Sequence, residues 1–278
     1  MTGATGLIGN ALCEKLRRKQ YCVRTLSRKN GDFKWNVNEG YIDRHALDRI
    51  DCIIHLAGET IAQRWTETAK QKIMQSRIRS TGILTREILR QDRHLLLICA
   101  SGINYYGFDR PELLTEKSSS GEGFLAEVCR QWENTAVTEG ITVKTIRTGV
   151  VLTPEGGMLK KILPPFKLGL GGHIGSGQQM MSWISLEDIC RVYIHAIEND
   201  SLTGAVNAVA PEPVSNREFT KLLSKALHRP AVLPLPSLLI KTLFGRMGTE
   251  TVLSNLRVKP EKLLSCDFSW THPDIDFL

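Results

Sequence analysis

The sequence has no long apolar run. None of its segments approaches the roughly 18 consecutive apolar residues of a membrane-spanning helix, and no basic start with an apolar centre marks a signal peptide. Hydrophobic residues make up 42% and charged residues 23% of the 278 residues, as in ordinary globular domains. We therefore expect a cytoplasmic protein without a membrane partner, built as one large domain or as two closely joined lobes.

Paired cysteines are also missing. The seven cysteines are an odd number, lie scattered along the chain and form no Cys-x-x-Cys pair. A disulfide framework or a zinc site has closely spaced cysteines. The sequence therefore predicts reduced thiols, most of them buried, and no metal site.

Aromatic residues and clustered charge are scarce too. Aromatic residues make up only 6%, and the longest basic cluster is Arg17-Arg18-Lys19, although 36 basic residues outnumber 29 acidic ones. Nucleic-acid binding needs a concentrated basic surface or stacking rings beside basic side chains. We expect no nucleic-acid partner, because solvated helix faces and an anionic cofactor account for the net charge of +7.

The strand that should precede the first glycine is short as well. Only Met1 and Thr2 stand before Gly3, whereas a strand usually has about five residues. In a doubly wound sheet the first strand is central and is hydrogen-bonded on both sides. We expect either that several apolar residues precede Met1 in the natural chain or that the sheet is weakened there.

Glycine, by contrast, is concentrated at the start, which reads Met1-Thr2-Gly3-Ala4-Thr5-Gly6-Leu7-Ile8-Gly9. In a strand-turn-helix unit, such glycines allow a sharp bend, close approach of a pyrophosphate, and tight packing of the helix. A helical pattern over 10–18 follows, with its positive end toward the turn. The turn predicts a dinucleotide site, although a plain structural turn has similar glycines; the contacts we expect are Gly3, Ala4, Thr5, Gly6, Leu7 and Ile8.

The end of the second expected strand indicates which dinucleotide binds. An NAD site has an acidic residue there, which accepts hydrogen bonds from the ribose 2′-hydroxyl. This chain has Ser27-Arg28 instead, and an arginine beside a hydroxyl holds a 2′-phosphate by charge-assisted hydrogen bonds. We predict NADP(H) as the cofactor, with Ser27 and Arg28 at that phosphate; the alternative is a solvated basic turn.

Strand and helix patterns alternate through the first half of the chain. Long helical patterns cover 65–89 and Phe124–Ala136. This alternation predicts an α/β fold with a Rossmann-like, doubly wound parallel sheet and helices on both faces. The expected strands are Cys22–Leu26, Cys52–Leu56, Leu95–Ala100 and Thr142–Arg147.

Glycine and proline become frequent after Arg147, which indicates a second, smaller lobe. Ser185-Leu186-Glu187-Asp188 has the form of a capping box and predicts a helix to about Glu198. We expect one more strand at Ala205–Ala208 and helices around 218–227 and 237–244. The predicted division is an NADP(H)-binding domain at 1–152, with 185–208 returning to it, and a small α/β substrate or lid lobe at 153–184 and 209–278.

Several motifs together resemble a known family. Beside the glycine-rich start they are Leu-Ala-Gly-Glu at 56–59, Arg-Trp at 64–65 with Ser-Arg at 76–77, Tyr-Tyr-Gly at 105–107, Arg-Thr-Gly-Val-Val-Leu at 147–152 and a glycine-rich run at 164–184. The chain resembles the extended short-chain dehydrogenase/reductases, and more narrowly an epimerase-like subgroup of the NAD-dependent epimerase/dehydratase family. The resemblance covers nearly the whole chain. It implies a nucleotide-sugar epimerase, although some members are labelled cell-division inhibitors.

The same resemblance implies further cofactor contacts. Small residues at the end of the third expected strand let the cofactor pass close to the backbone. Arg77 fits a place on a helix surface equally well, a helix surface is the better explanation for Lys72, and Val151 is equally compatible with simple packing. The positions that correspond to cofactor contacts of the subgroup are Leu56, Ala57, Gly58, Lys72, Arg77 and Val151.

One feature of short-chain dehydrogenases is missing, because no Tyr-x-x-x-Lys occurs in the chain. In that pair the tyrosine is the general acid/base, and the lysine one helical turn away lowers the pKa of the phenol. If Glu133 aligns with the acidic residue that often follows the pair, Leu125 and Cys129 fill the two positions. Neither can move a proton in that way.

The segment from Ser101 to Gly107 directly follows an expected strand, at the carboxyl edge where ligands bind. Ser101 can orient a substrate carbonyl, and Tyr105 or Tyr106 can donate a proton. The alternative is that the two rings only line a pocket wall. We predict Ser101, Tyr105 and Tyr106 as the catalytic candidates.

Three functions stay open on this reasoning. The first is an NADP(H)-dependent oxidoreductase or epimerase acting on an unidentified small molecule, such as a nucleotide sugar or a carbonyl compound. The second is a non-catalytic NADPH sensor, and the third is an interacting protein, such as a division regulator, with a vestigial cofactor site. The missing pair favours the last two, whereas the glycine-rich second lobe favours the first. A homodimer through helices of the first lobe is expected.

Overall fold

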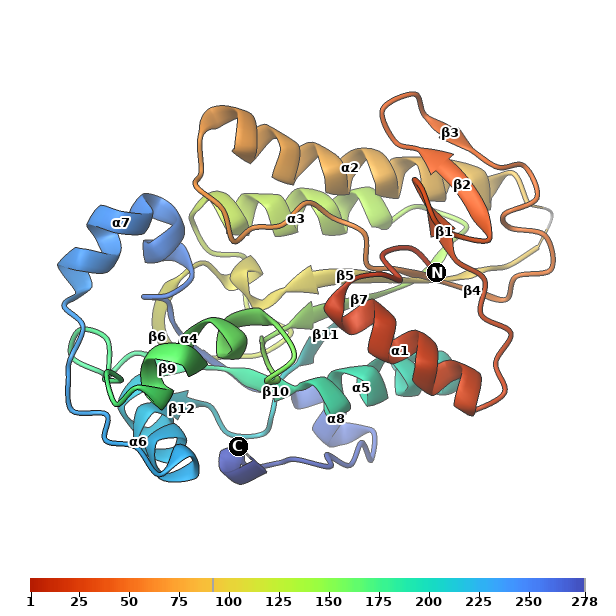
Figure 1. Cartoon of the computed structure of the whole chain (residues 1–278). Coiled ribbons are helices and arrows are strands. Elements are labelled where there is room, and N and C mark those ends of the chain that lie inside the picture. Colours follow the sequence, from red (N-terminus) through yellow and green to blue (C-terminus); the bar gives the residue numbers. More distant parts are fainter. Residues whose placement is uncertain (92, 278) are drawn as a thin grey trace.

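A parallel sheet forms the centre of the fold in the computed structural model, which describes residues 1–91 and 93–277 (Figure 1). Its four main strands are all parallel and lie in the order β11-β7-β5-β4. The bounds are β4 Cys52–His55, β5 Leu96–Gly102, β7 Thr142–Thr148 and β11 Gly204–Ala208. These four predicted strands are confirmed to within a few residues, and the α/β fold with them.

Thr2 joins this sheet to a second set of strands. Its backbone bridges β4 at His55 on one side and Leu26 on the other, both in the parallel sense. Leu26 belongs to β1 (Leu26–Ser27), which pairs in parallel with β2 (Phe33–Asn36), and β2 pairs antiparallel with β3 (Tyr41–Ile42). The first strand of the doubly wound pattern is therefore represented by a single bridging residue.

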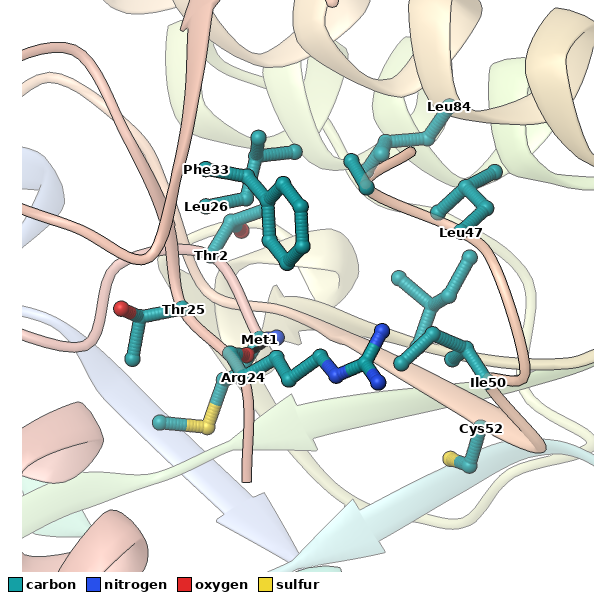
Figure 2. A pocket seen from close by; sticks show the side chains of 12 residues that line it. Met1, Thr2, Arg24, Thr25, Leu26, Phe33, Leu47, Ile50, Cys52 and Leu84 are labelled. Atoms are coloured by element: carbon teal, nitrogen blue, oxygen red, sulfur yellow. Dashed lines mark hydrogen bonds between the residues drawn. The ribbon is translucent and has the colours of Figure 1, made fainter. Parts of the chain in front are cut away.

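The predicted strand Cys22–Leu26 is wrong except for its last residue. Residues 21–25 have no strand conformation, because the neighbour on their inner side is the Met1–Thr2 segment, which reaches only Leu26. The amino group of Met1 donates to the carbonyl oxygen of Arg24 over 2.5 Å. Figure 2 shows the small cavity beside this place, with Phe33 and Cys52 among its lining residues.

Helices cover both faces of the sheet, as the alternating sequence pattern predicts (Figure 1). α1 (Leu7–Arg18) and α5 (Leu186–Glu198) lie together on one face, and α2 (Glu67–Leu89) and α3 (Phe124–Ala136) lie together on the other. Successive residues of β5 point to opposite faces, so that Ile98 packs toward α1 and α5 while Leu97 packs toward α2 and α3.

The N-cap of the predicted capping box forms at the start of α5, but its reciprocal hydrogen bond from the Ser185 N–H to Asp188 is not present among the described residues. The hydroxyl oxygen of Ser185 accepts a hydrogen bond from the backbone N–H of Asp188 over 2.9 Å. The Asp188 carboxylate in turn accepts from the backbone N–H groups of Thr271 and His272 over 2.7 and 2.9 Å. This cap therefore also fastens the C-terminal segment to the sheet.

A second hydrophobic cluster lies beyond the sheet, with Trp183, Phe166 and Phe219 at its centre. It is consistent with the predicted small lobe, whose boundaries stay an interpretation. The helices predicted near 218–227 and 237–244 are present as α6 and α7, and α7 runs six residues further. The remaining elements are β6 Asp109–Leu114, β8 Val150–Leu152, α4 Gly157–Lys167, β9 Met180–Met181, β10 Trp183–Ser185, β12 Val214–Ser215, α6 Asn216–Leu227, α7 Ser237–Glu250, β13 Asn255–Val258 and α8 Glu261–Ser265, with 3-10 turns at Ile103–Tyr106 and Ile275–Phe277.

A buried histidine links the glycine-rich turn to α2. His55 Nδ1 lies 2.7 Å from Thr2 Oγ1, and its Nε2 lies 3.0 Å from Ser80 Oγ. Ser80 donates its hydroxyl proton to the carbonyl oxygen of Ser76 over 2.6 Å, so its oxygen accepts from the ring. His55 therefore carries its proton on Nε2, and Nδ1 accepts from Thr2.

The His55 ring is neutral in the folded protein. It is fully buried between Trp35 and Trp132, and burial lowers its pKa from 6.5 to about 3. Each neighbour already has the hydrogen-bonding role that the neutral ring requires. A second ring proton would have no acceptor at Thr2 unless that hydroxyl turned away.

We expect the protein to lose stability as the pH falls below 6.5, because the unfolded chain takes up a proton at His55 that the folded protein excludes. The stabilisation is complete above 6.5 and declines by about 1.4 kcal/mol per pH unit toward the folded pKa. Urea unfolding between pH 7 and 5 measures this slope. His55→Gln should flatten it, whereas the exposed His45→Asn should leave it in place; equal slopes for wild type and His55→Gln would contradict the assignment.

Candidate functional site

The glycine-rich turn leaves no room for side chains at two of its positions. Gly3 has φ +68°, and a Cβ there would stand 2.7 Å from the carbonyl carbon of Leu56. A Cβ on Gly9 would stand 2.1 Å from the oxygen of Gly3. The turn is closed by a 3.0 Å hydrogen bond from the N–H of Gly6 to the oxygen of Gly3.

The start of α1 suits an anionic group. Gly6 is the N-cap residue, so no side chain caps the helix, and its first turn contains no acidic residue. The first amide groups of a helix have no partner inside it and carry its positive end. Thr5 and Gly6 are exposed, and Ala4, Leu7 and Ile8 are half-buried. These six predicted positions thus form one accessible turn that fits a phosphate.

Val151 comes close to this turn through a pair of glycines. A Cβ on Gly156 would stand 2.8 Å from a methyl carbon of Leu7, and one on Gly157 would stand 3.5 Å from the oxygen of Val151. Val151 itself is half-buried in β8, where it pairs with Ile184. The structure therefore brings Leu7 and Val151 to the same region.

Arg77 and Gly58 form a second part of the site. The N–H groups of Leu56 and Ala57 both donate to Thr2 Oγ1 over 3.2 Å, which fixes the chain as it leaves β4. Arg77 Nη1 donates to the carbonyl oxygen of Glu59 over 3.0 Å, and a Cβ on Gly58 would stand 3.0 Å from its Cζ. The guanidinium thus lies against the 56–59 segment, where a glycine is needed for it to fit.

Lys72 is exposed on α2. It lies one helical turn before Ser76, whose hydroxyl oxygen accepts from the N–H of Glu59 over 3.0 Å. A contact of Lys72 with the cofactor stays a prediction.

Ser27 and Arg28 lie at the carboxyl end of β1, which Thr2 separates from β4. Both strands are parallel, so their ends share the sheet edge that carries the glycine-rich turn. The hydroxyl oxygen of Ser27 accepts from the N–H of Lys29 over 3.3 Å, and Arg28 is exposed. An arginine at this edge is available to an anionic group beside the turn.

A buried ion pair lies at the ends of β5 and β7, on the same edge of the sheet. Arg147 of β7 donates from Nε and Nη2 to the two carboxylate oxygens of Glu133 of α3, over 2.9 and 2.7 Å. Ser101, at the end of β5, donates its hydroxyl proton to Glu133 Oε1 over 2.7 Å. Burial disfavours the Arg147 charge, but the hydrogen bonds and charge of Glu133 outweigh it and raise the pKa of the guanidinium. The guanidinium therefore stays charged although it is buried.

The two tyrosines have different surroundings. The Tyr106 hydroxyl is fully buried, accepts from Arg147 Nη1 over 2.9 Å and donates to Asn207 Oδ1 over 2.8 Å. Burial raises the pKa of its phenol. Tyr105 is half-buried, and the Arg147 guanidinium stacks on its ring at 3.4 Å from the centroid. Tyr106 is therefore part of the framework, whereas Tyr105 is partly accessible.

Leu125 and Cys129, which we predict to replace the tyrosine and lysine of the missing pair, are both buried on α3. Burial raises the pKa of the Cys129 thiol, so the neutral thiol is favoured. The Glu250 side chain of α7 caps the first turn of α3, because its Oε2 accepts from the N–H of Leu125 over 3.0 Å.

Sequence reasoning missed the roles of Arg147, Asn207 and Glu250. Arg147 carried one usable signal, since a charged residue in a strand expected at the centre of a covered sheet needs a buried partner. Asn207 and Glu250 carried none, because their contacts with Tyr106 and Leu125 span 101 and 125 positions of the chain.

The fold and this edge define a Rossmann-like, nucleotide-binding type of α/β protein. A model of the NAD dependent epimerase/dehydratase family matches residues 1–208, and a domain of unknown function (DUF1731) matches 235–277. The chain belongs to the NAD-dependent epimerase/dehydratase family.

Individual relatives agree with this assignment. Epimerase family protein Mb2239 of Mycobacterium bovis is 40% identical, over 99% of this chain and 94% of its own. The crystal structure of human epimerase family protein SDR39U1 (isoform 2) with NADPH superposes with a TM-score of 0.90 at 32% identity, over 99% and 95% of the chains. A nucleoside-diphosphate sugar epimerase from Corynebacterium glutamicum gives 0.80 at 34%, over 99% and 56%.

Among residues 1–91 and 93–277, no helix is both long and apolar enough to cross a bilayer.

We expect Glu133→Gln to destabilise the protein by about 3 kcal/mol or more, because it leaves the Arg147 charge buried without its partner. Urea unfolding measures the loss. Glu127→Gln is the matched control on the same helix, where the partly exposed Glu127–Arg130 pair contributes about 0.5 kcal/mol at most. Similar losses for the two variants would show that the buried pair has no special weight.

Proposed function

We propose that this protein binds NADP(H) and uses it for oxidoreductase or epimerase chemistry on a small molecule. The observation that carries the proposal is the uncapped start of α1 behind a turn that only glycine fits, with Arg28 at the neighbouring strand end. The crystal structure of human SDR39U1 with NADPH supports it, since that protein is similar along nearly the whole chain.

The residues present fit a 2′-phosphorylated dinucleotide. The first amide groups of α1 would hold the pyrophosphate, and the cationic Arg28 would hold the 2′-phosphate with the hydroxyl of Ser27. The cofactor would lie along the backbone of Leu56, Ala57 and Gly58, and the Arg77 side chain would support that segment from behind. Val151 would lie at the nicotinamide end, and Lys72 would stay on the surface.

When bound, the cofactor supplies or accepts a hydride; the protein must orient the reacting carbon and move a proton. Ser101 is held in place by Glu133, so its hydroxyl oxygen can accept a hydrogen bond from a substrate hydroxyl. Tyr105 is the tyrosine that a substrate can reach, and we assign the proton transfer to its hydroxyl. Tyr106 acts as a positioning residue, because its hydroxyl holds Arg147 under the Tyr105 ring.

The substrate class that we favour is a nucleotide sugar or another small carbonyl compound. The name of the Corynebacterium glutamicum protein supports the first of these. A sugar hydroxyl and the carbonyl formed from it present the donor and acceptor that Ser101 and Tyr105 can contact.

A non-catalytic NADPH sensor, or a cell-division regulator, is the second candidate. It is favoured by the burial of Leu125 and Cys129, which we predict to replace the tyrosine and lysine of the missing pair. It is also favoured by the Tyr106 hydroxyl, which makes its hydrogen bonds to Asn207 and Arg147 inside the protein. Such a protein would keep the turn, Arg28 and Arg77 but would need no proton donor. For either function we propose a cytoplasmic location and a homodimer formed through helices of the first lobe.

We expect NADPH to bind more tightly than NADH by about ten- to a hundredfold, because one charge-assisted contact contributes roughly 1.5–3 kcal/mol. Arg28→Ala should remove most of this difference, whereas Lys29→Ala, also exposed and one residue further on, should keep it. Calorimetric titration with both dinucleotides measures the four affinities. Equal affinities for the two in the unmutated protein would end the proposal for the 2′-phosphate site.

We expect Tyr105→Phe to lower turnover about a hundredfold or more while leaving NADPH affinity nearly unchanged, because a proton-transfer contact is lost and cofactor contacts are not. Tyr106→Phe should instead lower the free energy of unfolding by about 1–3 kcal/mol, since Asn207 and Arg147 lose a buried partner. NADPH absorbance in a screen of carbonyl compounds and nucleotide sugars provides the assay. Normal turnover in Tyr105→Phe would exclude the assignment, and no turnover at all would favour the sensor.

A further inference from the structure

The small lobe carries a concentration of large, exposed apolar side chains. Six of them, which we call the apolar rim, are each more than half exposed: Leu168, Leu170, Val232, Leu233, Leu238 and Leu243. In the rest of the described chain, the large apolar side chains that are at least half exposed come from four separate segments: Tyr41, Leu89, Leu113 and Val137. Exposed apolar surface that gathers in one part of a molecule marks a place of contact.

The rim comes from two segments that lie side by side. The N–H of Leu233 donates to the oxygen of Gly171 over 3.1 Å, and the N–H of Leu235 donates to the oxygen of His173 over 2.8 Å. α7 starts directly after this ladder and stands at the edge of the molecule (Figure 1). Ile240 and Glu250 of α7 are buried, whereas Leu238 and Leu243 are exposed on different sides of the helix, since five residues separate them.

The two chain segments that carry the rim contain charge of a single sign. Residues 156–186 and 219–249 contain no aspartate or glutamate, whereas they contain three and five lysines or arginines, respectively. Lys167 directly precedes the rim residue Leu168, and Lys241 stands on α7 between Leu238 and Leu243; both lysines are exposed. The rim is therefore an apolar surface with a basic border.

We propose that the apolar rim docks on an anionic lipid surface. Such a surface takes up leucine side chains at the level of its headgroups and attracts lysines and arginines to its phosphates, so it complements both features. A second copy of the chain fits less well, because a two-fold contact would place the same basic border opposite itself. The sequence-based expectation of no membrane partner rested on the lack of a spanning segment, which surface docking does not require.

The helix that carries part of the rim also reaches the candidate site. Glu250, at the inner end of α7, accepts a hydrogen bond from the N–H of Leu125. The rim and the edge that carries Ser101 are thus linked through one helix. The docking proposal does not depend on the proposed hydride chemistry.

Co-sedimentation of the full chain with vesicles tests the proposal. We expect binding to vesicles of equal parts phosphatidylcholine and phosphatidylglycerol, weaker binding as ionic strength rises, and little binding to phosphatidylcholine alone. Leu238→Glu with Leu243→Glu should lower the affinity about tenfold or more. Val137→Glu is the matched control, because it changes an equally exposed apolar residue outside the rim and should bind like the wild type.

A charge variant and the oligomeric state complete the test. Lys167→Glu with Lys241→Glu keeps the apolar side chains and should also weaken binding, and both double variants should keep the thermal midpoint because all four residues are exposed. The proposal is overturned if the wild type ignores anionic vesicles or if the leucine variant binds them like the wild type. A wild-type dimer that the leucine variant converts to monomers without lipid would assign the rim to a second copy and equally overturn it.

Discussion

The buried pair of Arg147 and Glu133 is the interaction on which the candidate site depends. One strand and one helix contribute opposite charges that water cannot reach, so each must satisfy the other in fixed geometry. Ser101 and the Tyr106 hydroxyl complete the hydrogen bonds of the pair, and the guanidinium supports the Tyr105 ring. The site therefore keeps a rigid polar framework although the tyrosine–lysine pair of related enzymes is missing.

The other half of the edge is held by backbone contacts instead of charge. Gly3 packs on the carbonyl group of Leu56, and the Thr2 hydroxyl accepts from the two amides that follow His55. The neutral His55 ring links the Thr2 hydroxyl to Ser80 of α2 through hydrogen bonds at its two nitrogens. A turn held in this way at its base leaves the amide groups at the start of α1 facing outward, which is what a phosphate site requires.

Local patterns predicted the buried parts of the fold well. Cys52–His55 is a short apolar run and Thr142–Thr148 is rich in β-branched residues, both typical of strands, and the Ser185 cap marked the start of α5 correctly. The strand expected at Cys22–Leu26 has the same apolar character, yet it forms only at Leu26, because a strand also needs a neighbour to bond with. The parallel pairing of β6 with β13 was not predicted, since its two strands are more than 140 residues apart.

The sequence by itself determined the glycine-rich turn, the parallel α/β order, the arginine in place of an acidic residue and the missing tyrosine–lysine pair. Each of these depends on residue type and short spacing, which act through local sterics and charge. Only the tertiary structure decided that Tyr106 is enclosed while Tyr105 is partly accessible, that the Arg77 guanidinium meets the 56–59 segment, and that Glu250 caps the start of α3. Burial and hydrogen-bond partners are set by segments far apart in the chain, and neighbours in sequence do not reveal them.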